Sequence, residues 1–99
     1  MFKQLIEVKT SDPDALVAQV TDYDLSSAIG LKDVAVYADR GRDNVYFIEA
    51  VFSSLEEAER NNGRDETDRW AARLRELVDE DPFYCNLVSV SDLVTTKGE

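Results

Sequence analysis

Four short runs of the chain have the hydrophobic pattern or the composition of β-strands. Residues 2–10 alternate, with Phe2, Ile6 and Val8 on one side of the predicted strand. Residues 32–39 are rich in β-branched and aromatic side chains, and residues 83–90 alternate again. Residues 45–52 are apolar on both sides except at Glu49, so we expect this strand at the centre of a sheet with both faces covered.

Apolar residues recur at helical spacing between the first two strands. A capping side chain precedes a proline at residues 11–14, which predicts a helix that begins there and frays near residues 26–27. The apolar stripe of this helix is expected to contain Leu16, Val17, Val20 and Tyr23.

A second helical region follows the third strand. Two overlapping capping boxes, Ser53 with Glu56 and Ser54 with Glu57, predict a short helix that runs to about residue 61 and is stopped at residues 62–63. Residues 65–78 predict a longer helix with Trp70 on its apolar stripe. The second helical region is therefore expected to be split in two.

The predicted order β-α-β-β-α-β is that of an α+β, ferredoxin-like domain. A right-handed crossover then gives a four-stranded antiparallel sheet ordered 4-1-3-2, with the helices on one face. We expect residues 46, 48, 50 and 52 to face the helices, and Val45, Phe47, Glu49 and Val51 to lie on the open face with Leu5 and Glu7. The expected domain covers residues 1–94, and residues 95–99 form a C-terminal tail.

Composition excludes several classes of function. The 99 residues carry a formal charge of −10, which argues against a broad basic face for nucleic acid or for an anionic membrane. There is no histidine and a single cysteine, Cys85, so one chain cannot form a Ser-His-Asp or Cys-His nucleophile, a His-ligated haem or a Cys/His zinc site. Because of the missing histidine and the lone cysteine, we expect a protein that needs no cofactor and no metal. We expect it to be cytoplasmic, since neither a leader nor an apolar run of about 20 residues is present.

The segment VYFIEAVFSSLEEAERNNGRDETDRWAARL, residues 45–74, resembles the antibiotic-biosynthesis-monooxygenase-like branch of the dimeric α/β-barrel superfamily. The shared features are a strand ending in an aromatic, a Ser-x-Glu-Glu-Ala turn, a polar break with Asn, and a Trp/Leu helix. The detailed match covers residues 45–90. It implies a homodimer whose sheets face each other, and a small cavity between sheet and helices or between the two sheets.

Members of that superfamily include cofactor-independent oxygenases of polyketide-like aromatics and haem-degrading enzymes. The haem-degrading pattern combines Asn, Trp and an iron-ligating His, whereas this chain has Trp70 but no His, so the resemblance does not extend to haem degradation. Many relatives also carry a histidine where this chain has Asn61 and Asn62. A cofactor-free oxygenase of this sequence would have to use a carboxylate, tyrosine or cysteine as its base.

Glu49 is the candidate catalytic residue. If the open face is enclosed, burial penalises the ionised form of the Glu49 carboxylate. The carboxylate then takes up a proton more readily, as a general base working near neutral pH must. The alternative is that Glu49 pairs with an Arg or Lys across the strands or across a subunit interface. Glu7 is a weaker version of the same case, because Lys3 and Lys9 flank it.

The other candidates for a ligand pocket are Leu5, Glu7, Tyr37, Phe47, Val51, Trp70 and Asn86. The aromatic candidates also have structural interpretations: Tyr37 can cover apolar surface on its strand, and Trp70 can pack in the core. Cys85 is expected to be a small buried hydrophobe. Residues 79–81 form either a hard-cation site or a solvated helix end, and Arg40 and Arg42 bind either an anion or a partner subunit.

Two functions from different classes fit this pattern. One is a cofactor-independent monooxygenase-like enzyme acting on a small aromatic or quinol-like compound. The other is a non-catalytic dimeric module for ligand binding or protein interaction. A cavity with Glu49 pointing into it favours the enzyme, and a solidly packed interface between sheets favours the module.

Overall fold

The computed structural model describes residues 2–22 and 28–90. Its elements are β1 (Phe2–Lys9), α1 (Pro13–Thr21), β2 (Leu31–Ala38), β3 (Val45–Phe52), α2 (Leu55–Asn62), α3 (Asp65–Leu77) and β4 (Phe83–Val88). The expected fraying near residues 26–27, the place of Tyr23 and the C-terminal tail lie outside the described residues.

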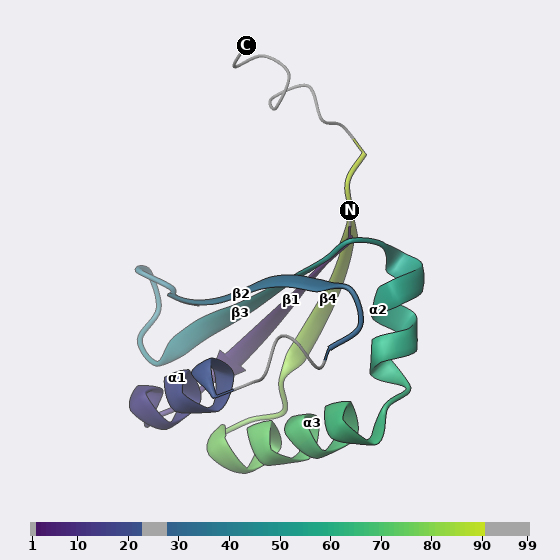
Figure 1. Ribbon diagram of the computed structural model, residues 1–99. Helices are drawn as coiled ribbons and strands as arrows, with labels where there is room; N and C mark the ends of the chain where they lie inside the picture. Colours follow the sequence, from purple (N-terminus) through teal and green to yellow (C-terminus); the bar gives the residue numbers. More distant parts are fainter. Residues whose placement is uncertain (1, 23–27, 91–99) are drawn as a thin grey trace.

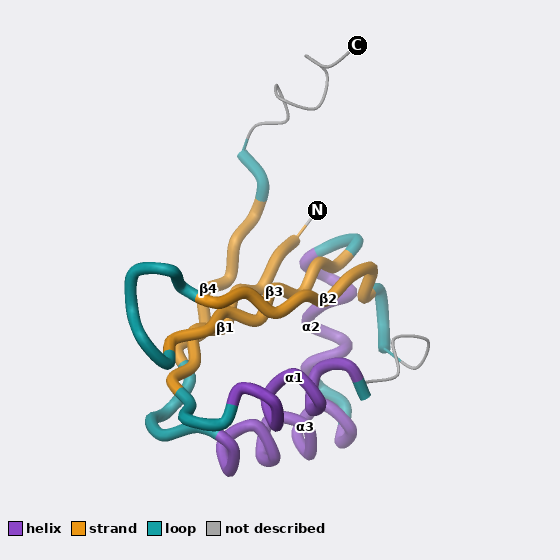
Figure 2. Tube along the Cα trace, turned by 90° about the vertical axis from the view of Figure 1, so that its left-hand side faces the viewer, coloured by secondary structure: helices purple, strands orange, loops and turns teal. Residues whose placement is uncertain are grey.

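The four strands form one antiparallel sheet in the order β2-β3-β1-β4, which confirms the predicted 4-1-3-2 arrangement. The three helices lie on the same side of this sheet, and the opposite side carries no helix of the described chain (Figures 1 and 2). The molecule is therefore an α+β, ferredoxin-like domain of two layers, with β3 and β1 at the centre of the sheet.

Strand register sorts the side chains between the two faces. Ile6 pairs with Ile48, and both lie in the core under the helices. Leu5 pairs with Glu49 and Glu7 pairs with Phe47, and these residues occupy the open face. Because side chains alternate along a strand, this register confirms the predicted division of β3.

The main core lies between the helices and the central strands. It consists of Ile6, Val8, Leu16, Val20, Ile48 and Leu74. Leu16 and Leu74 are completely buried, and they join α1 and α3 to the sheet. Val17, predicted on the apolar stripe of α1, is 42% exposed because it lies about 100° around the helix from Leu16 and so points away from the sheet.

Side-chain caps start two of the helices. At α1 the Asp12 carboxylate accepts a hydrogen bond from the Ala15 N–H, at 3.2 Å. At α2 the Ser54 hydroxyl accepts from the Glu57 N–H, at 3.1 Å, so the second of the two predicted capping boxes starts this helix. The Ser53 hydroxyl instead donates to the carboxylate of Glu57.

Candidate functional site

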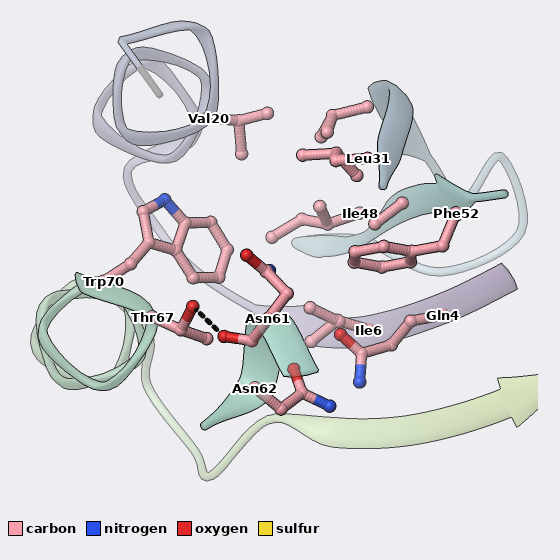
Figure 3. Close-up of a pocket in the computed structure, with 12 residues that line it drawn as sticks. Gln4, Ile6, Val20, Leu31, Ile48, Phe52, Asn61, Asn62, Thr67 and Trp70 are labelled. Atoms are coloured by element: carbon pink, nitrogen blue, oxygen red, sulfur yellow. Dashed lines mark hydrogen bonds between the residues drawn. The ribbon is translucent and has the colours of Figure 1, made fainter. Parts of the chain in front are cut away.

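A pocket of about 60 Å³ lies between the sheet and the helices. Most of its wall is apolar and comes from both layers: Ile6, Ile48 and Phe52 belong to the central strands, whereas Val20 and Trp70 belong to α1 and α3 (Figure 3). Its polar lining residues are Gln4, Asn61, Asn62 and Thr67. An apolar cavity with a few polar groups is the usual composition of a small-molecule site.

Asn61, on the last turn of α2, is the buried polar group of this pocket. Its side chain is almost completely enclosed, with 4% of the residue exposed. The Asn61 Oδ1 accepts hydrogen bonds from the backbone N–H of Ile29 at 3.1 Å and from Arg64 Nη1 at 3.3 Å. These two donors orient the amide, because only its oxygen can accept them.

The other end of the same amide is available to a ligand. Within residues 2–22 and 28–90, the Asn61 Nδ2 has no hydrogen-bond partner, and the side chain extends into the pocket between Trp70 and Ile48 (Figure 3). An N–H donor in apolar surroundings favours a ligand that places an oxygen acceptor there.

Trp70 forms the helical wall of the pocket. Its indole Nε1 donates to the backbone carbonyl of Gln19 on α1, at 3.3 Å, and the Gln19 side-chain Nε2 donates to the backbone carbonyl of Trp70, also at 3.3 Å. One turn earlier on α3, the Thr67 hydroxyl donates to the backbone carbonyl of Asn61, at 2.6 Å. These contacts join α1, α3 and the end of α2 around the cavity.

Two further amides lie towards the surface. Asn62 is exposed, and Gln4 Nε2 donates to Asn86 Oδ1 on β4, at 3.2 Å. No ionisable side chain is among the described residues that line the pocket. As formed by these residues, the pocket can therefore bind and orient a ligand but supplies no side-chain acid or base.

The candidates predicted from the sequence do not converge on this pocket. Trp70 lines it, and Asn86 lies next to it through its bond to Gln4. The rest belong to the opposite, open face of the sheet, as their register shows: Leu5, Glu7, Tyr37, Phe47, Glu49 and Val51. The expected set is thus divided between the two faces within one chain.

Two ion pairs lie on the open face. Lys3 Nζ lies 3.4 Å from Glu49 Oε2, which is the cross-strand ion pair considered as the alternative role of Glu49. Arg42 Nη1 lies 3.2 Å from Glu7 Oε2, and the Arg42 guanidinium is 6.0 Å from the centre of the Phe47 ring. These pairs cover part of the apolar surface of β3.

The loop between β2 and β3 holds Arg42 in this position. The Gly41 N–H donates to Asp39 Oδ1 at 2.8 Å, and Arg42 Nε donates to Asp39 Oδ2 at 2.9 Å. The Gly41 bond, followed by the Arg42 bond, holds the pKa of the Asp39 carboxyl below its ordinary value. Both bonds are strongest to the ionised carboxylate, and the Arg42 bond holds the guanidinium near Glu7 at ordinary pH.

The remaining sequence candidates show no convergent site. No cluster of three or more potential metal ligands occurs within the described ranges, residues 79–81 included. Glu80 is 3.8 Å from Lys9 in an exposed ion pair, and Cys85 is partly buried on the open face opposite Leu5. None of the helices in the described part of the chain is long and apolar enough to cross a membrane.

The pocket amides could have been found from one sequence signal. Gln4 is a polar position in the helix-facing row of β1, between Phe2 and Ile6. Asn61 follows the buried Ala58 by three residues, which places it on the buried side of α2. A polar residue on a buried face is the informative exception to hydrophobic patterning.

Comparison with known proteins identifies the fold. The sequence matches no protein-family model and no curated protein. Among solved structures, a candidate antibiotic biosynthesis monooxygenase from Bordetella bronchiseptica is similar, with a TM-score of 0.76 at 13% identity over 91% of this chain and 97% of that one. A variant of SnoaB, a cofactor-independent oxygenase from Streptomyces nogalater, gives a TM-score of 0.73 at 14% identity over 93% and 95% of the two chains.

A candidate antibiotic biosynthesis monooxygenase from Deinococcus radiodurans agrees, with a TM-score of 0.75 at 11% identity over 93% of this chain and 95% of that one. The chain therefore has the fold of the antibiotic-biosynthesis-monooxygenase-like branch of the dimeric α/β-barrel superfamily. In particular, nearly its whole length superposes on a cofactor-independent oxygenase.

Proposed function

We propose that this protein is a cofactor-independent monooxygenase-like enzyme acting on a small phenol or quinol-type aromatic compound, bound in the pocket between Trp70 and the sheet. The observation that carries this proposal is the buried Asn61 amide, which lines a mostly apolar pocket and whose Nδ2 has no hydrogen-bond partner among the described residues. An aromatic ring that carries an oxygen atom matches that combination of apolar wall and amide donor.

The proposed chemistry uses the substrate as its own electron donor. The Asn61 N–H donates to the phenolate oxygen, and the apolar wall excludes water from the electron-rich ring. Reaction of a phenol with O2 then places one oxygen atom on a ring carbon and releases the other as water. The two hydrogens of that water come from the hydroxyl group and the ring carbon, so a phenol and O2 give a quinone and water.

Among the described residues none that lines the pocket is ionisable, and this sets a condition on the chemistry. The substrate must arrive as the phenolate or lose its proton to solvent, since Glu49 lies on the other face of the sheet. Glu49 remains a candidate base only for a ligand held against the open face. The same lack of a base favours a second candidate function, a module that binds a small aromatic ligand without turning it over.

We also propose that the open face packs against the same face of a second copy. Phe47 and Val51 lie there on a central strand, and Tyr37, Phe83 and Leu87 on the flanking strands are 51%, 64% and 44% exposed. An apolar face of this extent is rarely left in water, and a two-fold axis covers it with an identical surface. The fold relatives support this, because their superfamily is dimeric.

The test compares Asn61→Asp with Asn44→Asp. The first change retains an oxygen for Ile29 and Arg64 but replaces the Nδ2 donor with an acceptor. The second change lies at an exposed loop position that does not line the pocket. We expect Asn61→Asp to weaken binding of a phenol or naphthol about 10- to 100-fold, the value of a hydrogen bond to a charged oxygen, and to remove protein-dependent oxygen uptake.

Asn44→Asp should change binding by less than about 3-fold, which corresponds to well under one hydrogen bond. Calorimetric titration measures affinity, an oxygen electrode measures turnover above the protein-free rate, and thermal melting monitored by circular dichroism checks the fold. Equal binding by wild type and Asn61→Asp would contradict the assigned site. Tight binding without oxygen uptake would favour the second candidate function, the binding module, over the enzyme.

A further inference from the structure

We infer that Gln19 limits the size of the aromatic ring accepted by the pocket, because it holds the indole of Trp70 over the cavity. This inference rests on the proposed function of the pocket. Gln19 touches no ligand in this scheme and is therefore a positioning residue. Its contacts are with Trp70, and Trp70 provides the wall.

The contacts between Gln19 and Trp70 are reciprocal. The glutamine side chain donates to the Trp70 carbonyl, and the indole donates to the Gln19 carbonyl, both at 3.3 Å. They join α1 to α3, which lie side by side under the sheet (Figure 2). The next residue on α1, Val20, lines the pocket and is 6% exposed, so the same turn of α1 both holds the indole and contacts the cavity (Figure 3).

One wall of the pocket must move if a ring is to bind wholly inside it. A cavity that holds benzene has a volume of roughly 150 Å³, whereas this pocket has about 60 Å³. On the sheet side, Ile6 and Ile48 are 2% and 1% exposed and belong to strands that are paired on both sides. Such packed positions do not yield easily.

The helix side can yield more easily. Trp70 is only partly buried, and an outward rotation of its indole would break the Nε1 bond to Gln19. The glutamine side chain bonds to the Trp70 backbone and opposes separation of α1 from α3, and it thereby keeps the Gln19 backbone carbonyl within reach of the indole Nε1. Larger rings require a larger rotation, so they are penalised more by the Gln19 contact than small rings are.

The experiment uses Gln19→Met, which keeps the length and helix propensity of the side chain but removes its donor. The control is Thr21→Ala on the same helix, since the exposed Thr21 hydroxyl bonds only to the Ala18 carbonyl among the described residues. Calorimetric titration with phenol and 1-naphthol gives the ratio of the two dissociation constants, naphthol over phenol, for each protein.

Trp70 is the single tryptophan of the chain, so acrylamide quenching of its fluorescence reports the exposure of the pocket wall directly. In Gln19→Met we expect greater quenching than in wild type without ligand. We also expect the naphthol-to-phenol ratio to fall about 2- to 10-fold, the range of one neutral hydrogen bond, with both values unchanged in Thr21→Ala.

The outcomes separate this inference from the proposed function. If wild type binds both compounds and Gln19→Met changes both dissociation constants by the same factor, Gln19 has a merely structural role and the inference is wrong, while the proposed function stands. Unchanged quenching in Gln19→Met would overturn the inference as well. If no protein binds either compound, the proposed function fails, and the size limit fails with it.

Discussion

Replacing Gly30 by alanine should destabilise the protein and damage the pocket together. Gly30 has a φ of +70°, in the left-handed region that favours glycine, and a Cβ there would lie 2.6 Å from the Cβ of Glu57 on α2. Its carbonyl also accepts the Ser53 N–H, at 2.9 Å. The neighbours of Gly30 belong to the site, because Ile29 donates to Asn61 and Leu31 lines the pocket.

The size of the effect follows from these two features. An L-residue in the left-handed region costs about 1–2 kcal/mol. Carbon atoms prefer separations of roughly 3.5–4.0 Å, so α2 or the loop must move, at a cost of about 1–3 kcal/mol. The more restricted unfolded chain offsets about 0.4–1 kcal/mol, which leaves a net loss of about 1–5 kcal/mol.

Urea unfolding monitored by circular dichroism measures this loss, and Gly41→Ala is the matched control. At Gly41 the nearest atom to a new Cβ is Asp39 Oδ1 at 3.5 Å, an ordinary contact, and we expect a change within about 0.5 kcal/mol. In a Glu57→Ala background the cost of Gly30→Ala should fall but not vanish, because the Glu57 Cδ and Oε2 contacts disappear while the Cβ remains. Equal stability of Gly30→Ala and Gly41→Ala would refute the reasoning.

Two further predictions concern the open face. Phe47→Asp places an unpaired charge at the proposed interface and should convert the proposed dimer into an 11.2 kDa species or unfold it. Val17→Asp on the exposed side of α1 should leave the mass unchanged. Sedimentation at micromolar concentration measures the mass, and a wild type that is already monomeric contradicts the dimer. Glu49→Gln removes the ion pair with Lys3 and should lower stability by no more than about 1 kcal/mol while oxygen uptake persists, as expected for a partly exposed pair. Loss of turnover with an intact dimer would restore Glu49 as the base.

Local patterns and one topological rule were enough to predict the fold. The run from residue 45 to residue 52 is a strand with those same limits, because an apolar run interrupted only at Glu49 is bounded by polar residues at both ends. The Ser54 cap and the break after Asn62 also fall where predicted, since both depend on neighbours in the sequence. The strand order follows from the handedness of the crossover.

The pocket depends on contacts that no local pattern contains. The donors that orient Asn61 include Ile29, 32 positions away, and the indole of Trp70 meets a carbonyl 51 positions away. The sequence reasoning placed the site on the open face because that face lacked a cover. The family resemblance allowed a cavity between sheet and helices as well as one between two sheets, but the size and lining of such a gap are set by packing of the helices rather than by their amphipathic pattern.

The two faces of the sheet differ in their polar groups, which are charged on the open face and neutral in the pocket. This difference separates their proposed roles. The open face presents two ion pairs, Lys3 with Glu49 and Arg42 with Glu7, whereas Asp33, opposite Val51, forms no ion pair with the described residues. The pocket presents neutral amides, among them Asn61, and the described lining residues include no ionisable group. Ligand affinity should therefore follow the ionisation of the ligand, near pH 10 for a simple phenol, and not a titration of the pocket itself.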